Sequence, residues 1–506
     1  MKNQKRALSK EQVDKVVALY SSGKIKETID EIKALNKDYP NVPLLFNLLG
    51  ACYKKLGQLK LAVNAFESAI AIKPDYAEAY NNLGITFKAL MQVDKATQSY
   101  KKAVAINPNF AEAHNNLGNV CKDLGRLDNA AQSYKQAIAI NPNFAEAHNN
   151  IGAVFKELNQ LDDAVKSYKK AITLRPKYAD AHFNYGNLMS SYKKLDEALL
   201  SYEIAYSAKP QIDYLFGNLL YTKMCLCFWR DFSGHLEELK TKISQSQISL
   251  PLQSILAMID DPKLQLRAAK TQSNRLYPQS LKVPVLEKYP ANKKIRIGYF
   301  SADFRTHPVA ELVAELFEKH DRMKFEVHAF SYGPATNDEL NVRIKAGVDY
   351  FHEISQMSHE AAVIYARSYT IDIAIDLGGH TQDARTEVFA MSVAPLQVCY
   401  LGYAGTMGAS YMDYIIADSI VIPQGNEKYY VEKIVYLPTS YMVNNSKMKP
   451  SKKVFMRKDF GLPKQGVVFC CFNNHYKITP STFSSWMKIL LKVDKSVLWL
   501  ADSNKT

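Results

Sequence analysis

The chain has 506 residues, more than one hydrophobic core usually organises, so we expect at least two domains. Its apolar content of 47% and charged content of 23% are those of an ordinary globular protein. No apolar run approaches about 18 residues, which excludes a membrane-spanning helix. The first residues carry charge without a following apolar core, so they predict no signal peptide.

The net charge is +14, a balance that favours acidic peptides, phosphate-bearing ligands, nucleic acid or anionic membrane. The Lys and Arg residues are scattered and no nucleic-acid-reading motif is present, so we expect neither a nucleic-acid nor a membrane partner. The seven cysteines show no CxxC pair and no metal spacing. They indicate buried free thiols in a reducing cytoplasm, with no metal site.

A 34-residue period runs through the first half of the chain. It places prolines at Pro40, Pro74, Pro108, Pro142, Pro176 and Pro210, and glycines at Gly50, Gly84, Gly118, Gly152 and Gly186. A fixed period of this length predicts stacked helical hairpins that bury their apolar faces only against their neighbours. The pattern resembles tetratricopeptide repeats, and we assign residues 1–228 to a superhelix of this kind.

The same period repeats an asparagine in the first helix of each hairpin. The series is Asn82, Asn116, Asn150 and Asn184; Asn218 continues it in a degenerate copy and Leu48 interrupts it. A carboxamide can hold a peptide unit of an extended chain through its acceptor and its donors, so we interpret the row as a peptide-binding ladder. The alternative is that these side chains bond to neighbouring helices or face water. The repeated His114, His148 and His182 lie too far apart to share a metal and are expected to be structural.

Residues 229–290 read as a connecting helical segment, and strands and helices then alternate. Strands are expected at 293–304, 325–332, 348–354, 371–377, 395–403 and 412–418, and helices at 310–320, 338–346, 359–369 and 385–391. This alternation predicts a doubly wound, mostly parallel sheet over residues 291–460.

Three of the expected strands end in polar or glycine-rich segments. The first delivers Asp303 and His307, the fourth Asp376 to Thr381, and the fifth the loop Gly402–Gly408. Ligands of such sheets bind beyond the carboxyl ends of the strands, and glycines there let backbone amides approach them. The segments therefore predict one binding site, although a lone histidine such as His307 is more often structural than catalytic.

Five longer motifs carry a family resemblance: IRIGYFSADFRTHPV, DLGGHT, APLQVCYLGYAGTMGASYMDYIIAD, EKIVYLP and CCFNNHYKITPSTFSSWMKILLKV. They are similar to the O-linked N-acetylglucosamine transferase and SPINDLY family. The resemblance implies tetratricopeptide repeats followed by a glycosyltransferase of two Rossmann-like domains (GT-B type). Members of the family transfer a sugar from a nucleotide-sugar to Ser or Thr hydroxyls of proteins, and they grip those proteins with an asparagine ladder.

The resemblance also implies roles for single residues. It makes His307 the catalytic histidine and Lys477 the cation beside the leaving diphosphate, where it offsets developing charge. It assigns donor binding to Asn474, Tyr476, Lys477, Gly405, Thr406, His380 and Thr381. The chain departs from the family pattern at Ala404, Asn474 and His475, which bear on the choice of donor.

Residues 461–506 begin the second, nucleotide-binding domain but provide only two strands and a helix, so we expect a truncated domain with weak nucleotide binding. The function implied first is transfer of N-acetylglucosamine from UDP-GlcNAc to proteins held by the repeats. The alternatives are transfer of fucose from GDP-fucose, and a non-catalytic scaffold that binds protein partners. We expect a cytoplasmic protein that needs no metal or cofactor, with a homodimer through the repeats as a further expectation.

Overall fold

The structure, a computed structural model, describes residues 8–290, 292–449 and 452–501. The chain forms two compact units that divide between Lys209 and Pro210. This differs from the expected repeat boundary at residue 228, because the helix after Pro210 packs within the second unit. The first seven residues of the charged N-terminal segment lie outside the described residues. Within the described ranges no helix combines the length and apolarity needed to cross a bilayer.

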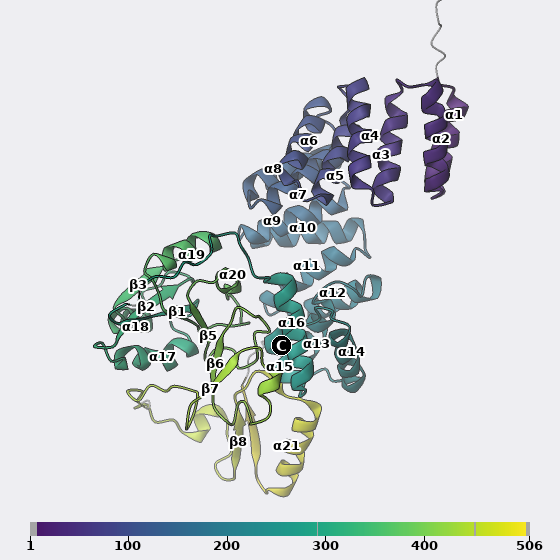
Figure 1. Cartoon of the computed structure of the whole chain (residues 1–506). Helices are drawn as coiled ribbons and strands as arrows, with labels where there is room; N and C mark the ends of the chain where they lie inside the picture. The colour runs from purple at the N-terminus through teal and green to yellow at the C-terminus, as the bar shows by residue number, and fades with distance from the viewer. Residues whose placement is uncertain (1–7, 291, 450–451, 502–506) are drawn as a thin grey trace, which may run out of the picture. The chain divides into compact units, whose positions relative to one another are not determined.

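The first unit consists of antiparallel helix pairs stacked in chain order, which confirms the helical repeat array (Figure 1). Its helices are α1 (Lys10–Ser21), α2 (Ile25–Asp38), α3 (Pro43–Lys55), α4 (Leu59–Ile72), α5 (Ala77–Ala89), α6 (Val93–Ile106), α7 (Ala111–Asp123), α8 (Leu127–Ile140), α9 (Ala145–Glu157), α10 (Leu161–Leu174), α11 (Ala179–Ser191) and α12 (Leu195–Ala208).

A glycine on the first helix of each pair accommodates an aromatic ring from the second. A Cβ atom at Gly118 would lie 2.7 Å from the ring of Tyr134, which is fully buried. The same contact joins Gly50 to Phe66, Gly84 to Tyr100, Gly152 to Tyr168 and Gly186 to Tyr202. The missing side chain lets the helices approach, and the ring fills the space between them.

The repeated histidines have a structural role, as expected. His114 Nε2 lies 3.0 Å from the carbonyl oxygen of Pro108, and His148 and His182 make the same hydrogen bond with Pro142 and Pro176. Each proline ends a helix because it cannot continue the hydrogen-bond ladder. The histidine then bonds the carbonyl group in the turn before its own helix.

The second unit combines a helical segment with two parallel sheets (Figure 1). Its first helices are α13 (Leu215–Cys225), α14 (Phe232–Ser244), α15 (Leu252–Met258) and α16 (Pro262–Leu276). The large sheet contains β1 (Ile295–Ser301), β2 (Phe325–Ser331), β3 (Tyr350–Glu353), β4 (Ile373–Asp376), β5 (Leu396–Cys399), β6 (Tyr414–Ala417) and β7 (Lys433–Tyr436). Its helices are α17 (Pro308–Lys319), α18 (Glu339–Gly347), α19 (His359–Arg367) and α20 (Thr386–Ala390).

The large sheet is parallel throughout, in the order β3-β2-β1-β4-β5-β6-β7. This confirms the predicted doubly wound sheet and adds β7, which was not expected as a strand. β1 pairs with both β2 and β4, so Ile297 lies opposite Val327 on one side and Ile373 on the other. The chain leaves β1 in one direction and returns at β4 in the other, which makes the gap between β1 and β4 the topological switch point.

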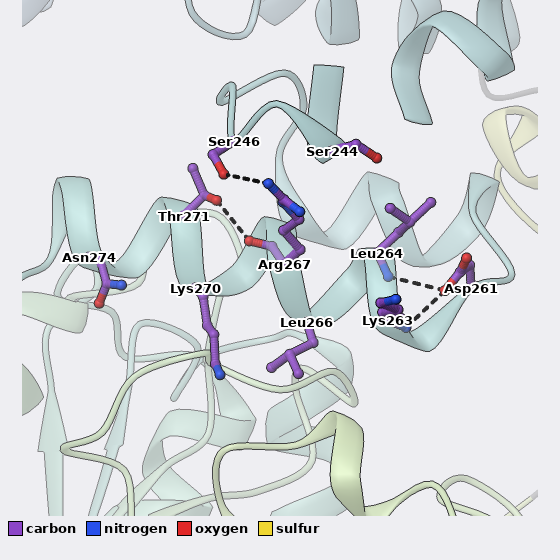
Figure 2. Close-up of a pocket in the computed structure, with 10 residues that line it drawn as sticks. All are labelled: Ser244, Ser246, Asp261, Lys263, Leu264, Leu266, Arg267, Lys270, Thr271 and Asn274. Atoms are coloured by element: carbon purple, nitrogen blue, oxygen red, sulfur yellow. Dashed lines mark hydrogen bonds between the residues drawn. The ribbon is translucent and has the colours of Figure 1, made fainter. Parts of the chain in front are cut away.

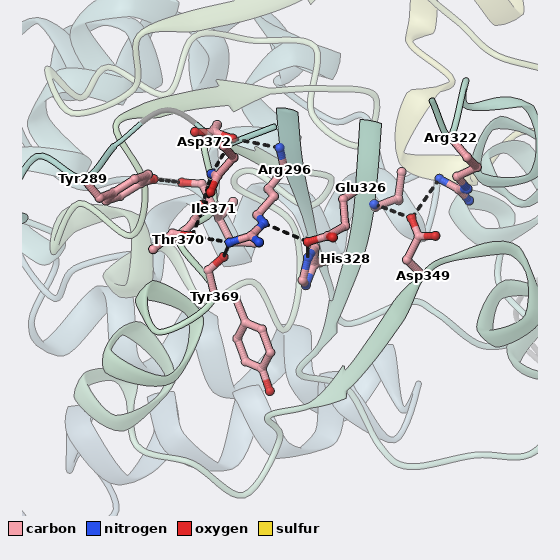
Figure 3. Close-up of polar contacts among 12 residues, drawn as sticks. Tyr289, Arg296, Arg322, Glu326, His328, Asp349, Tyr369, Thr370, Ile371 and Asp372 are labelled. Carbon is pink, nitrogen blue, oxygen red and sulfur yellow. Dashed lines mark hydrogen bonds and ion pairs between the residues drawn. The ribbon is translucent and has the colours of Figure 1, made fainter. Parts of the chain in front are cut away.

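Ion pairs join the starts of the strands (Figure 3). Asp372 accepts a hydrogen bond from the Arg296 amide nitrogen at 2.8 Å, and the Arg296 guanidinium pairs with Glu326 at 2.8 Å. Asp349 accepts from the Val327 amide nitrogen at 2.7 Å. These contacts connect neighbouring strands at the amino end of the sheet.

The last part of the second unit is a small βαβ element. The strands β8 (Val468–Cys471) and β9 (Val497–Leu500) pair in parallel, and α21 (Pro480–Lys492) connects them. The short helix η3 (His475–Lys477) lies between β8 and α21. The two strands and one helix expected after residue 461 are therefore present.

The contact between Gly118 and Tyr134 predicts a large effect of a small substitution. Gly118→Val places a branched side chain against the buried ring, so we expect the free energy of unfolding to fall by about 2 kcal/mol or more. Denaturant titration followed by circular dichroism measures this loss. Gln136→Ala on the exposed face of α8 is the matched control and should change stability little; equal stability of both variants would contradict the packing role of the glycine.

Candidate active site

A cavity of about 340 Å³ opens at the carboxyl ends of the large sheet. Residues that follow β1, β4 and β5 line it together with one residue of α15. They are Asp303, Arg305, His307, Val309, Leu377, Thr381, Gln382, Asp383, Gly402 and Gln253. The structure thus brings together the three strand ends that the sequence singled out, at the switch point between β1 and β4.

His307 ends the loop after β1 and caps α17. Its Nδ1 atom lies 3.3 Å from the Val309 amide nitrogen, and Pro308 occupies the first helical position, where its missing N–H is not needed. The same Nδ1 lies 3.5 Å from Oδ2 of Asp303, whose side chain is 15% exposed. The imidazole is 37% exposed. It is therefore fixed by its own loop and still open to the cavity.

A buried carboxylate shapes the loop after β4. Oδ1 of Asp376 accepts hydrogen bonds from the amide nitrogens of Gly378 and Gly379, at 2.9 and 3.0 Å. Gly379 has a φ of +62°, a conformation that glycine adopts without strain. Burial raises the pKa of Asp376 to about 6, although the two amide hydrogen bonds oppose the shift. Asp376 therefore stabilises this turn from the interior of the fold, while Thr381 lines the cavity.

A second buried carboxylate, Glu432, holds the glycine loop after β5. It accepts from the Thr406 hydroxyl at 2.7 Å and from the Met407 amide nitrogen at 2.6 Å, and burial raises its pKa. Thr406 Oγ1 also accepts from the Gly408 amide nitrogen at 3.1 Å. Both Thr406 and Glu432 are almost fully buried. The Thr406 hydroxyl is therefore engaged inside the loop.

His380 and Gly405 also support the loops from within. His380 Nε2 lies 3.0 Å from the Met407 carbonyl oxygen, and burial lowers its pKa to about 4, so the imidazole is neutral. A Cβ atom at Gly405 would lie 2.6 Å from the Tyr403 hydroxyl, so only glycine fits there. The structure places neither residue on the lining of the cavity, in contrast to Thr381.

Three of the residues expected to bind the donor, Asn474, Tyr476 and Lys477, lie in η3 or directly before it. Asn474 and Lys477 are exposed, whereas Tyr476 is 9% exposed and packs on Tyr221 of α13 with ring centroids 4.9 Å apart. The Lys477 ammonium lies 6.0 Å from the centre of the Tyr476 ring. Tyr476 therefore supports the turn, and Asn474 and Lys477 are its accessible polar groups.

The asparagines of the repeats bond to one another across neighbouring hairpins. Nδ2 of Asn116 donates to Oδ1 of Asn81 at 3.0 Å. The corresponding bonds run from Asn82 to Asn47, from Asn150 to Asn115 and from Asn184 to Asn149, at 3.1, 3.1 and 3.0 Å. The side-chain amide nitrogens of these asparagines therefore bond to neighbouring helices, which was the alternative to peptide binding. Each ladder residue is still partly exposed, and Oδ1 of Asn150 also accepts a hydrogen bond from Nδ2 of Asn149 at 3.3 Å.

Comparison with known protein families identifies a repeat region and a glycosyltransferase region in the chain. Residues 276–453 and 444–503 match the model of glycosyl transferase family 41, and residues 50–90, 92–125, 118–159 and 154–191 match the TPR repeat. Residues 276–503 form a glycosyl transferase family 41 domain. The buried carboxylates, η3 and all residues that line the cavity except Gln253 lie within this domain.

Several curated proteins are similar to part of this chain. The chain is 35% identical over 304 residues to a probable UDP-N-acetylglucosamine–peptide N-acetylglucosaminyltransferase SEC of Arabidopsis thaliana, with 56% of this chain and 31% of that protein covered. It is 28% identical over 405 residues to the UDP-N-acetylglucosamine–peptide N-acetylglucosaminyltransferase of Caenorhabditis elegans, with 54% and 35% covered. The chain thus spans about a third of the length of these curated relatives.

Among solved structures, the chain is similar to an O-GlcNAc transferase mutant of Thermobaculum terrenum. The TM-score is 0.49 at 24% sequence identity, with 77% of this chain and 68% of that chain covered.

A larger and more open cavity of about 860 Å³ lies along α16, away from the strand ends (Figure 2). Lys263, Arg267 and Lys270 line it, and Arg267 donates to the Ser246 hydroxyl at 3.4 Å. The opposite side of α16 packs on the glycine loop of the family 41 domain, where the Ser273 hydroxyl donates to the Met407 carbonyl oxygen at 2.6 Å.

The sequence analysis did not identify the buried residues that hold the loops around the family 41 site. Glu432 lies in the EKIVYLP motif, but its position gave no sign that it would hold the loop after β5. Ser273 lies in the connecting segment, 134 residues from the loop it bonds. Arg305, in contrast, stands between Asp303 and His307 in the same motif and could have been named as a lining residue from the sequence.

The raised pKa of Asp376 predicts a pH-dependent stability of the family 41 domain. Its folded-state pKa of about 6 exceeds the usual value near 4, so the carboxyl group stabilises the fold at low pH. This contribution is lost as the pH rises from about 4 to about 6, and two pKa units correspond to about 3 kcal/mol. Asp376→Asn keeps an oxygen that accepts from the glycine amides but does not titrate.

The free energies of unfolding of the wild type and the Asp376→Asn variant are measured between pH 4 and pH 7. The difference should shift in favour of the variant as the pH rises. Parallel pH profiles of the two proteins would show that Asp376 does not titrate in this interval.

Proposed function

We propose that the protein transfers N-acetylglucosamine from UDP-GlcNAc to Ser or Thr hydroxyls of polypeptides bound by the repeats. The observation that carries the proposal is the cavity at the switch point, where His307 and Asp303 face Thr381 and Gly402 within a family 41 domain. The names of the similar proteins give the same donor and a peptide acceptor. The TPR repeats provide a surface for such an acceptor.

The chemistry requires a proton acceptor and a cation. As the acceptor hydroxyl bonds to the sugar carbon it loses its proton, and the bond from that carbon to the diphosphate breaks. His307 is the group that receives the proton, because its imidazole is accessible at the end of β1. Lys477 on η3 stabilises the negative charge that develops on the leaving diphosphate.

The position of Asp303 decides which nitrogen of His307 serves as base. When Nδ1 accepts the hydrogen bond from the Val309 amide, the proton of the neutral ring is on Nε2. When Nδ1–H instead donates to Asp303, 3.5 Å away, Nε2 is free to accept a proton and the carboxylate stabilises the resulting imidazolium. A base at Nε2 therefore requires the contact of Nδ1 with Asp303 in place of the hydrogen bond from Val309 that the structure contains.

His307→Asn is the sharpest test of this assignment. Asparagine is a favoured N-cap, so it keeps the start of α17 but cannot act as a base. We expect transfer of N-acetylglucosamine to a Ser-containing peptide to fall at least about 100-fold, while UDP affinity measured by calorimetry is unchanged.

Asp303→Asn should lower the rate less than His307→Asn, since it removes only the charge that orients the imidazole. Wild-type turnover in the His307→Asn variant would remove His307 from the mechanism. Transfer from GDP-fucose but not from UDP-GlcNAc would overturn the donor, and binding of peptides without transfer of either sugar would favour a scaffold.

The ladder is tested by replacing Asn116, Asn150 and Asn184 together by Ala. The substitutions remove the carboxamides together with their hydrogen bonds between hairpins, one each at Asn116 and Asn184 and two at Asn150, so stability should fall by about 1 kcal/mol per bond. We expect the affinity for an extended acceptor peptide to fall at least about tenfold. Asn109→Ala with Asn143→Ala, in exposed turns, is the control; unchanged peptide affinity in a folded triple variant would leave the asparagines a structural role only.

A further inference from the structure

The turn that carries Lys477 is held from two sides. His475 Nε2 lies 2.8 Å from the carbonyl oxygen of Ala501, directly after β9, so it ties the turn to the small βαβ element. Tyr476, the next residue, is 9% exposed and packs on Tyr221 of α13, with ring centroids 4.9 Å apart and planes inclined by 45°. Consecutive residues of η3 thus bind different parts of the second unit.

The contact with α13 matters because the βαβ element has little core of its own. None of the described residues of β8, α21 or β9 is fully buried, whereas Tyr476 and Ile478 in the turn are 9% and 3% exposed. A second aromatic pair, Trp229 with Phe483, lies 5.4 Å apart at the start of α21. The element is therefore held in place mainly by the helical segment that precedes the large sheet.

Tyr221 is well suited to this contact. Burial raises the pKa of its phenol, and a side-chain hydrogen bond joins it to Cys225 one turn further along α13. Its ring is fixed on a helix, and the ring of Tyr476 rests on it. The backbone of η3 then directs Asn474 and Lys477 outward, on either side of the buried tyrosine.

We propose that Tyr221 is a positioning residue for donor binding, which acts on the nucleotide diphosphate through Tyr476 and Lys477. The inference rests on the proposed function, in which Lys477 meets the diphosphate. A displacement of about 1 Å at a reacting group costs on the order of 100-fold in rate, so a contact that fixes the turn controls the use of its lysine. A segment outside the matched family 41 region, α13, thereby completes the donor side of the site.

The test compares Tyr221→Ala with Tyr221→Phe, using UDP as the probe and calorimetry as the measurement. The alanine variant should bind UDP at least about tenfold more weakly. The phenylalanine variant keeps the ring that contacts Tyr476 and should bind within about twofold of wild type. Phe228→Ala removes an aromatic side chain that is 47% exposed just after α13, and it should leave UDP affinity unchanged.

A double-mutant cycle distinguishes a positioning role of Tyr221 from a general loss of structure. If Tyr221 acts through Lys477, Tyr221→Ala combined with Lys477→Ala should bind UDP no more weakly than Lys477→Ala alone. Losses that add in full would overturn the inference, because Tyr221 would then act independently of the lysine.

Hydrogen exchange distinguishes this inference from the proposed function. Tyr221→Ala should speed amide exchange over residues 474–492, with or without nucleotide. If the wild type binds UDP and Tyr221→Ala binds it equally well, the inference fails and the proposed function stands. If the wild type does not bind UDP, the donor assignment fails for both, while faster exchange in the variant would still show that Tyr221 holds the turn.

Discussion

The parallel pairing of β1 with both β2 and β4 is the constraint on which the candidate site depends. Because the chain leaves β1 toward β2 and β3 and returns at β4, the loops after β1 and β4 diverge and leave a gap at their carboxyl ends. His307 and Thr381 meet across that gap, 74 residues apart in the chain. Shifting either strand by one residue would turn its side chains to the other face and dismantle the site.

Buried carboxylates fix the loops that surround this gap. Asp376 accepts the amides of the turn after β4, and Glu432 accepts the hydroxyl and amide of the glycine loop after β5. Both groups have raised pKa values because they are removed from water. Hydrogen bonds that fix the backbone geometry of the glycine loops offset part of the cost of burying these groups.

In the first unit, three contacts recur with the 34-residue period. The glycine–aromatic contact sets the distance within a hairpin, the histidine bonds the turn before its helix, and the asparagine amide links neighbouring hairpins. Most of the polar atoms that recur in the sequence are therefore used to build the array. The ladder asparagines nevertheless stay partly exposed.

The sequence by itself determined the repeat array, the parallel sheet and the three strand ends that form the cavity, because periodicity and strand–helix alternation are local signals. Tertiary structure alone decided which polar residues face the cavity. Thr406 and His380 stand in glycine-rich segments like Thr381, yet they bond Glu432 and Met407 inside the fold. The contact between Tyr476 and Tyr221 joins residues 255 positions apart, and no local pattern encodes such a packing partner.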